Sequence, residues 1–488
     1  MTGHELTTAN REFFDLVARA TVANPFSPER YELDLQIGRS PDRLNREQAV
    51  DASIARLKKE LQRLPSLDLG DYRPSEKRRL ELAVLFDVFH DFGPQMDALV
   101  QLQLEKGDEP VAVPFAREML GRLKEHGISS SVSERWVSLL YQIRRAYFFI
   151  HTTLVGDSAS MHRLRQRLWA NVFTDDLSLY EARLWNRMED FSTFLVGETG
   201  VGKGTAAAAL GFSGWIFFDA KKGRFQRSFT ESFVPINLSQ FPPTLIESEL
   251  FGHKKGAFTG AIDDYPGVFG RCHRRGVIFL DEIGEVDLSV QVKLLKVIEE
   301  RVFAPVGSHA SKRFEGRVVA ATNIAIDELR RERRFRDDLY YRLCSDIIEI
   351  PPLRGRIKED PEELRRLLSH IVENMIGDSQ EIVDRVCAVI EEQLPPDYSW
   401  PGNVRELEQC VRRVIMAREY RGDSAIGSAP ASDPMEQLGQ KMAMEKLEVR
   451  ELVSTYCQIL YERHQNYEEV GRRTGLDRRT VKKYIRGE

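Results

Sequence analysis

A glycine-rich segment at residues 197–205 has the composition of a phosphate-binding loop. It reads GETGVGKGT and follows the apolar residues 194–196, which predict a strand. Glycines at this spacing let backbone N–H groups turn toward phosphate oxygens, the next helix adds partial positive charge, and the lysine reaches the outer phosphates. The pattern predicts a nucleotide-binding loop of Gly197, Glu198, Thr199, Gly200, Val201, Gly202, Lys203, Gly204 and Thr205.

The residue after the lysine departs from the usual loop, which has a serine or threonine there to hold magnesium. This chain has Gly204, and Thr205 comes one residue later. One residue rotates a side chain by about 100° around a helix. We therefore expect magnesium to rest on phosphates, water and an acid instead of on Thr205.

Two strand ends supply that acid and further polar groups. The run GVIFLDE ends in Asp281 and Glu282, and the run RVVAATN ends in Asn323. Side chains at the carboxyl ends of parallel strands face the ligand crevice. We predict that Asp281 binds Mg²⁺, that Glu282 polarises the attacking water and that Asn323 orients the same water.

Arg336 and Arg342, in FRDDLYYRL, have two interpretations. They lie on a solvated helix face, or they are arginine fingers that neutralise charge on the transferred phosphoryl group. A finger donated across a subunit interface requires head-to-tail assembly, and closure of that assembly gives a ring.

Composition places the chain among ordinary soluble proteins. It has 488 residues, 42% hydrophobic and 30% charged, with a net charge of −5, which argues against a nucleic-acid coat protein. The five cysteines show no metal-binding spacing and predict free thiols in a reducing compartment. No apolar run approaches membrane length and no signal segment opens the chain, so we expect a cytoplasmic protein.

The residue pattern changes along the chain and predicts several structural regions. Residues 1–150 show helical periodicity, and no acidic pair follows an opening strand, which argues against a receiver domain. Short apolar runs then alternate with helical stretches, as in a mostly parallel sheet covered by helices. Residues 211–232 carry aromatic runs around the turn Lys221-Lys222-Gly223 and could be an inserted hairpin. The chain is helical again beyond Pro361.

Together these residues resemble one family, the AAA+ activators of bacterial sigma-54 RNA polymerase, also called enhancer-binding proteins. The resemblance covers roughly residues 154–420, and its most specific motif is ESELFGHKKGAFTGA at residues 247–261. In the family the last six residues of this motif form a loop that touches sigma-54. The resemblance thus implies a sigma-54 contact by Gly256, Ala257, Phe258, Thr259, Gly260 and Ala261.

The resemblance also implies roles for single positions, with ATP and Mg²⁺ as cofactors. Asp281 and Glu282 match the Walker B acids, Asn323 matches sensor I, and Arg336 and Arg342 match the paired fingers. Asn237 falls where family members have an asparagine that holds the catalytic glutamate in place. Arg405 in WPGNVRELE matches sensor II, and Val155 and Gly156 would lie near adenine. Two features depart from the pattern: relatives usually have glutamate at Gly204, and the segments flanking the glycine loop are longer here.

The last residues predict a helix-turn-helix. Gly475 would take the turn, and Val470, Leu476, Val481 and Tyr484 would form a small core. Five polar side chains on the second helix would face DNA, with relatives using dimeric tails on paired half-sites. They are Arg478, Arg479, Thr480, Lys482 and Lys483.

The prediction is therefore a multidomain chain. It has a helical regulatory domain of unknown signal (1–150), an α/β AAA+ ATPase subdomain (151–355), a helical lid (356–421), a linker (422–435) and a helix-turn-helix (436–488). We expect an activator that binds double-stranded DNA upstream of promoters and remodels sigma-54 RNA polymerase as a homo-oligomeric ring, a hexamer by the resemblance, in the cytoplasm of a bacterium and without a membrane. Gly204 leaves a second interpretation open, in which the chain is a DNA-binding regulator that binds nucleotide and hydrolyses little or none of it. A remodeller of another protein is the third interpretation.

Overall fold

A computed structural model describes residues 3–40, 44–422, 438, 449–464 and 466–486. The chain forms two compact units, one of Met1–Cys387 with Asp397–Ile415 and one of Ala388–Pro396 with Met416–Glu488. Within the described residues, no helix is long and apolar enough to cross a membrane.

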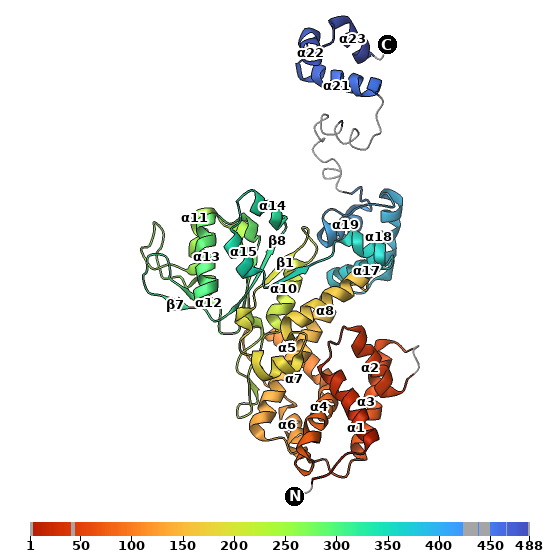
Figure 1. Ribbon diagram of the computed structural model, residues 1–488, viewed down its shortest axis with the longest axis vertical. Helices are drawn as coiled ribbons and strands as arrows, with labels where there is room; N and C mark the ends of the chain where they lie inside the picture. Colours follow the sequence, from red (N-terminus) through yellow and green to blue (C-terminus); the bar gives the residue numbers. More distant parts are fainter. Residues whose placement is uncertain (1–2, 41–43, 423–437, 439–448, 465, 487–488) are drawn as a thin grey trace. The chain divides into compact units, whose positions relative to one another are not determined.

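A five-stranded parallel sheet lies at the centre of the first unit (Figure 1). Its order is β4-β5-β8-β1-β9, and each neighbouring pair is parallel. The strands are β1 (Thr193–Val196), β4 (Phe233–Asn237), β5 (Val277–Asp281), β8 (Arg317–Thr322) and β9 (Asp346–Glu349). This is the mostly parallel α/β sheet that the alternating sequence texture predicted.

The strands are apolar throughout because both faces of the sheet are covered. Successive residues point to opposite faces, so Ile278 and Leu280 enter one core while Val277 and Phe279 enter the other. The core around Ile278 is closed by helices on one side of the sheet. They are α11 (Pro243–Phe251), α12 (Gly267–Arg271), α13 (Leu288–Glu300) and α15 (Asp337–Leu343).

The opposite core is shared between the sheet and the N-terminal helices. Leu195 and Val319 of the sheet belong to the same buried cluster as Phe14, Leu85 and Leu140. Helix α10 (Lys203–Phe212) and helix α8 (Ala159–Phe173) lie between the two layers, and both contact α7 (Ser130–Thr152). The N-terminal region is helical, as predicted, and it is continuous with the sheet's hydrophobic core. Its other helices are α1 (Thr8–Val22), α2 (Pro28–Gly38), α3 (Arg46–Gln62), α4 (Pro74–Asp91), α5 (Gly93–Lys106) and α6 (Ala116–Glu125).

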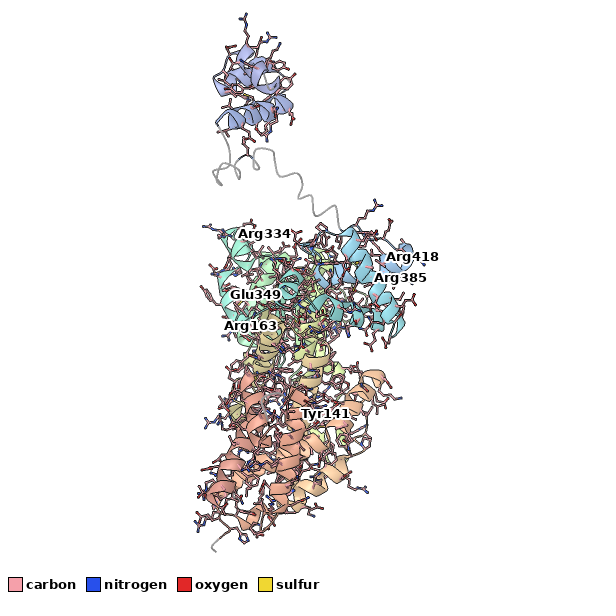
Figure 2. The ribbon with its side chains drawn as sticks, turned by 90° about the vertical axis from the view of Figure 1, so that its right-hand side faces the viewer. Tyr141, Arg163, Arg334, Glu349, Arg385 and Arg418 are labelled. Atoms are coloured by element: carbon pink, nitrogen blue, oxygen red, sulfur yellow. The ribbon has the colours of Figure 1, made fainter. Side chains whose placement is uncertain are left out.

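The predicted hairpin after α10 is present and helps to join these layers. Strands β2 (Phe218–Asp219) and β3 (Arg224–Phe225) pair antiparallel. Tyr141 of α7, labelled in Figure 2, stacks on Phe225 with ring centroids 4.4 Å apart. Arg145, fully buried on the same helix, donates hydrogen bonds to the carbonyl oxygens of Phe212 and Gly214. The end of the glycine-loop helix is therefore anchored by the N-terminal region.

The remaining elements complete the two units. A second hairpin pairs β6 (Val302–Phe303) with β7 (Lys312–Arg313), and α9 (Leu177–Leu179) precedes β1. The other helices are α14 (Ile326–Arg331), α16 (Leu353–Glu359), α17 (Glu363–Ile376), α18 (Gln380–Gln393) and α19 (Asn403–Ala417), and, in the second unit, α21 (Val449–His464), α22 (Tyr467–Thr474) and α23 (Arg478–Arg486). Residues 423–435 of the predicted linker lie outside the described residues, and none of the five cysteines, all of which are described, forms a disulfide.

Candidate functional site

The glycine-rich loop joins β1 to α10, as the sequence predicted. Lys203 is the first residue of α10 and is 7% exposed. Its Nζ donates hydrogen bonds to the carbonyl oxygens of Gly197 (2.8 Å) and Glu198 (3.1 Å). Burial lowers the pKa of Lys203, and the nearby carboxylates of Glu282 and Asp281 oppose that shift. The loop thus holds a buried cation at a helix N-terminus, the arrangement that binds anionic phosphate.

Two carboxylates face this cation from the end of β5. Asp281 is the last residue of the strand, and its Oδ1 accepts a hydrogen bond from the N–H of Glu282 at 3.1 Å. Glu282 adopts a left-handed backbone conformation with φ of 56°, which turns the chain sharply away from the strand direction. Burial raises the pKa of both groups, and the charge of Asp281 raises that of Glu282 further.

Asn323 connects Glu282 to the glycine loop. Its backbone N–H donates to Glu282 Oε2 at 3.3 Å, and its Nδ2 donates to Thr199 Oγ1 at 3.3 Å. Asn323 follows β8, which lies between β5 and β1 in the sheet. Parallel order therefore brings together three groups that are far apart in the sequence.

Asn237 lies beside this group but is bound elsewhere. It is the register partner of Asp281 in the β4–β5 pair. Its Oδ1 accepts hydrogen bonds from Ser239 N (3.0 Å) and Ser239 Oγ (2.7 Å). Across the described residues its side chain has no hydrogen bond to Glu282, so the predicted hold on that glutamate is not formed in this conformation.

The segment before α19 docks on the glycine loop. Val404 N donates to Gly200 O at 3.1 Å, and Asn403 Nδ2 donates to Thr199 O at 3.1 Å. A Cβ on Gly200, whose φ is 78°, would lie 2.2 Å from Gly402 O, so this close approach requires glycine. The same Cβ would lie 3.1 Å from that of Arg405. The Cβ of Arg405 thus lies beside the loop, and the role of its guanidinium near the phosphates stays a prediction.

Glu198 has a partner that the sequence motifs did not reveal. Arg354 of α16 forms a bidentate ion pair with its carboxylate, and Asn403 Nδ2 also donates to it at 3.2 Å. The hydrogen bond from Arg354 lowers the pKa of Glu198. The sequence did contain one signal for Arg354: it follows the PPL segment that comes after strand β9. Residues beyond the carboxyl ends of parallel strands face the ligand crevice.

A pocket of about 350 Å³ continues from the loop. Val155, Val201, Thr205, Ile350 and His370 are among its lining residues. Its size and mixed lining suit a nucleoside. Thr205 faces this pocket, which agrees with the expectation that it does not replace the missing residue after the lysine.

Val155 and Gly156 are fixed by buried charges. Arg356 donates to Val155 O at 2.5 Å and forms an ion pair with Glu363 at 2.7 Å, with both side chains buried. Arg165 donates to the carbonyl oxygens of Leu154 and Gly156. A Cβ on Gly156 would lie 2.0 Å from Glu363 Oε1, so a larger residue does not fit. These three side chains were not predicted from the sequence.

The residues around Lys203 fit a magnesium ion that is held largely by phosphates. Among the described residues no cluster of three or more His, Cys, Asp or Glu could form an all-protein metal cage. Asp281, half-buried at the strand end, offers one carboxylate, and no hydroxyl follows the lysine. Magnesium usually keeps several waters and takes one or two carboxylates plus substrate phosphates, which this arrangement allows.

The two candidate finger arginines differ in their surroundings. Arg336 precedes α15 and forms an ion pair with Asp338 at 2.6 Å. Arg342 lies at the other end of α15 and is exposed, and no ion pair to its guanidinium is found within the described part of the chain. Neither arginine has a hydrogen bond or ion pair to Lys203, Asp281 or Glu282 in that part. The structure does not bring them into the site of their own chain.

The GAFTGA segment forms a compact loop beyond α11. Gly256 and Gly260 have φ of 79° and 103°, and Gly256 N donates to Ala261 O at 2.8 Å, which closes the loop. Phe258 lies edge-on against the ring of His253, with centroids 5.0 Å apart, and remains 37% exposed. Thr259 is exposed. The resemblance implied that both residues contact sigma-54; the Thr259 side chain is open to solvent, and the Phe258 ring is partly covered by His253.

A second loop supports the first. Residues 304–311 connect β6 to β7, and Val306 exchanges hydrogen bonds with the loop's base through Gly252 O (2.8 Å) and Lys254 N (3.0 Å). A Cβ on Gly307 would lie 2.7 Å from that of Ala257. This neighbour was missed because nothing local in its sequence indicates the contact.

The three last helices form a small core. Val470 and Val481 are buried with Cys457 and Leu460 of α21, while Leu476 and Tyr484 pack at the edge. Gly475 has φ of 72° between α22 and α23. On α23, Thr480 Oγ1 donates to Asp477 (3.0 Å), Arg478 pairs with Glu468 (3.1 Å) and Lys482 lies over the Tyr467 ring (5.1 Å). Arg479 and Lys483 are exposed.

Comparison with known proteins identifies the central region. Residues 179–349 match the family model of the sigma-54 interaction domain. The chain is 35% identical over 272 residues to the DNA-binding transcriptional activator HyfR of Escherichia coli (strain K12), which covers 54% of this chain and 38% of the relative. It is 41% identical over 236 residues to the Nif-specific regulatory protein of Azotobacter vinelandii, covering 48% of this chain and 41% of the relative.

These matches span less than half the length of either relative. A crystal structure of NtrX from Brucella abortus in complex with ADP aligns with 77% of this chain and 76% of its own, at 21% identity and a TM-score of 0.40. A likeness this distant carries no argument about function. The family match and the named relatives confirm the resemblance to the bacterial enhancer-binding proteins: residues 179–349 match the sigma-54 interaction domain, and the chain is similar to transcriptional regulators of bacteria.

Proposed function

We propose that this chain is an ATP-driven activator of sigma-54 RNA polymerase. The observation that carries the proposal is the convergence of Lys203, Glu282 and Asn323 beside a loop built for phosphate, within a sigma-54 interaction domain. Lys203 would bind the outer phosphates, and Glu282 would accept a proton from the attacking water. Mg²⁺ would be held by Asp281 and would neutralise charge on the phosphate oxygens.

The active assembly is a ring of identical subunits. Arg342 is exposed and forms no ion pair in the described part of the chain, which suits a group that completes a neighbour's site. A head-to-tail contact generates a closed ring when its rotation closes. Ring closure would then place an arginine finger opposite Lys203 of the next subunit, and we expect a hexamer by family resemblance.

The GAFTGA loop couples hydrolysis to sigma-54. Its base is tied to the β6–β7 loop and to α11, which follows Asn237 on β4. Loss of the γ-phosphate releases segments that were ordered by it, and a loop whose position follows such a change can push on a partner. Thr259, exposed at its tip, is the side chain we assign to sigma-54 contact.

The last three helices bind double-stranded DNA as a helix-turn-helix. Arg479 and Lys483 are exposed on α23, whereas Thr480, Arg478 and Lys482 have partners within the unit. We therefore assign base contact to Arg479 and phosphate contact to Lys483, with Arg478 and Lys482 joining after exchange of partners.

A phosphate-release assay on the full chain tests the enzymatic part. The full chain is needed because the N-terminal helices and the sheet share one core. We expect the rate of ATP hydrolysis per chain to rise with protein concentration, since assembly completes the site. Lys203→Ala should lose hydrolysis. A rate per chain that does not depend on protein concentration, or no hydrolysis at all, would contradict a site shared between subunits.

The second candidate is a DNA-binding regulator that binds nucleotide with little turnover. Gly204 favours it, because no hydroxyl follows the lysine and nothing lies within 4 Å of a Cβ built there. Tight binding of an ATP analogue together with negligible phosphate release at high protein concentration would select this alternative. The convergence of Glu282 and Asn323 favours the active enzyme.

A further inference from the structure

The N-terminal helices enclose a cavity that the proposed ATP chemistry does not use. Its volume is about 520 Å³, which lies in the range of small-molecule sites. It opens among α2, α3, α4, α7 and α8, all in the first unit. The lining includes an aromatic wall, cationic or neutral nitrogen groups, and the four carboxylates of Asp34, Glu47, Asp51 and Asp157.

The aromatic wall is ordered by ring contacts. Phe26 stacks on Tyr147 with centroids 5.4 Å apart and an interplanar angle of 9°, and Trp169 meets Phe26 edge-on at 6.0 Å. Phe86 and Phe89 line the cavity from α4. Flat rings on several sides favour a planar aromatic ligand, because aromatic contacts add to simple burial.

His90 is the polar group with capacity to spare. Its ring packs against Phe86 with centroids 4.5 Å apart, and it has no hydrogen bond within the described residues. Burial, and then the charges of Arg30 and Arg144, lower the pKa of His90 to about 3. The imidazole is therefore neutral at pH 7 and offers one donor and one acceptor.

The surroundings of His90 favour an anion. Arg30 pairs with Asp34 (3.0 Å) and Arg144 pairs with Asp97, so each guanidinium is held in place by its own carboxylate. Both guanidiniums still act on His90 as positive charges, with a smaller contribution from Lys58, and the charge of Asp91 opposes them. The other acids that line the cavity, Glu47, Asp51 and Asp157, are exposed. A carboxylate beside His90 would meet the imidazole donor and the positive charges of Arg30 and Arg144.

Arg165 connects this cavity to the nucleotide pocket. It lines the cavity, is 6% exposed, and its buried Nε has no hydrogen-bond partner. A different nitrogen of the same side chain, Nη2, donates to the carbonyl oxygens of both Leu154 and Gly156, and Leu154 lines the pocket beyond. Helix α8 separates the two spaces, since Met161 and Leu164 face the nucleotide pocket while His162 and Trp169 face the cavity.

We propose that this cavity is an effector site for a small planar aromatic molecule that carries a carboxylate. The ring lies among Phe26, Phe86 and Trp169, and the carboxylate accepts a hydrogen bond from His90. Occupation shifts α8 and Arg165, and through Gly156 it changes nucleotide binding. The binding site stands without the proposed ATPase, and only the coupling rests on it.

Titration calorimetry of the full chain tests the ligand class. The probes are benzoate, phenylacetate and indole-3-acetate, each compared with its neutral amide. We expect at least one carboxylate to bind with a Kd below about 1 mM, and its amide to bind about tenfold or more weakly. Binding should also change the fluorescence of the chain, because Trp169 lines the cavity.

Two cavity variants and one control sharpen the test. His90→Phe keeps the ring and removes the donor, so carboxylate binding should weaken about tenfold. Ala23→Trp places an indole at the cavity wall and should abolish binding of every probe. His309→Phe, in the exposed β6–β7 loop, should bind as the parent chain does. Circular dichroism and thermal unfolding establish that each variant folds.

Three results would overturn the proposal: no carboxylate binds, the amides bind equally well, or His90→Phe binds unchanged. The coupling is measured separately with a fluorescent ATP analogue, whose Kd should change about fivefold or more with a saturating carboxylate. Carboxylate binding without any binding of the ATP analogue would leave the cavity assignment intact and contradict the proposed ATPase.

Discussion

The backbone N–H of Asn323 donates a hydrogen bond to Glu282 Oε2 at 3.3 Å. The same residue reaches Thr199 of the glycine loop through its side chain at 3.3 Å. We expect a change in the loop to reach, through these two bonds, the carboxylate that we assign to water activation. Because the two bonds come from different atoms, they can be separated by mutation.

Asn323→Ala removes the bond to Thr199 and keeps the backbone bond to Glu282. We expect kcat for ATP hydrolysis to fall about 10- to 100-fold, because water and glutamate are no longer aligned with the loop. Binding of an ATP analogue should change little. Steady-state phosphate release and analogue titration measure the two effects, and a loss of affinity with unchanged kcat would show that Asn323 serves binding instead.

Glu282→Gln should lower kcat by about 10² to 10⁴ while the ATP analogue still binds. In the parent chain, burial raises the pKa of Glu282 above its ordinary value of 4.5, so the proton-accepting form is lost as the pH falls through this raised value. Activity should therefore decline at a higher pH than an exposed glutamate would give. The pKa of Asp281 is raised too, so the loss of activity at low pH reflects the titration of both carboxylates together.

Glu285→Gln is the matched control for that experiment. Glu285 is exposed and lies three residues further along the chain. Its variant should keep the parent's kcat, and its pH profile should shift only slightly toward lower pH, because the charge of Glu285 is the smallest of the causes of the raised pKa of Glu282. If the parent chain kept full activity as the pH fell to the ordinary pKa of glutamate, that result would argue against a buried carboxylate as the base.

Arg342→Ala should reduce ATP hydrolysis about 10³-fold or more if the arginine stabilises the transferred phosphoryl group. Mixing this variant with Glu282→Gln should restore part of the activity, because some interfaces then combine an intact arginine with an intact glutamate. Arg334→Ala, an exposed residue paired with Glu332, serves as control. Mixtures no more active than the separate variants would place both residues in one chain's site.

Arg145→Met should lower the free energy of unfolding by about 2–4 kcal/mol, because two buried carbonyl oxygens at the end of α10 lose their donors. Arg163→Met is the control, since Arg163 pairs with Glu359 at an exposed position (Figure 2) and should cost less than about 1 kcal/mol. Urea unfolding of the two variants measures the difference. Equal losses would mean that α7 does not anchor the glycine-loop helix.

Local sequence signals predicted the elements that short segments determine. The glycine loop before α10, the hairpin around Gly223 and the turn at Gly475 follow from residue type and spacing within one segment. The sheet and the helical N-terminal region followed from periodicity. These features depend on backbone preference and apolar pattern, which a single segment contains.

Long-range pairing was not predictable in the same way. Arg354 and Glu198 are 156 residues apart, and Asn403 and Glu198 are 205 apart. The place of Arg354 after a strand end indicated a position near the site, but no local pattern indicates that Glu198 is its partner or that Asn403 reaches the same carboxylate. The common core of Leu195 with Phe14 was equally hidden, because apolar periodicity shows that a face is buried but not what covers it.

Capture of purified sigma-54 by the full chain tests the central claim most directly. With ADP and aluminium fluoride, which imitate the transferring phosphoryl group, sigma-54 should co-elute with the assembled chain, and with ADP alone it should not. Thr259→Ala should hydrolyse ATP at the parent rate and fail to retain sigma-54. Failure of the parent chain to bind sigma-54 in any nucleotide state, or retention by Thr259→Ala equal to that of the parent, would contradict the account.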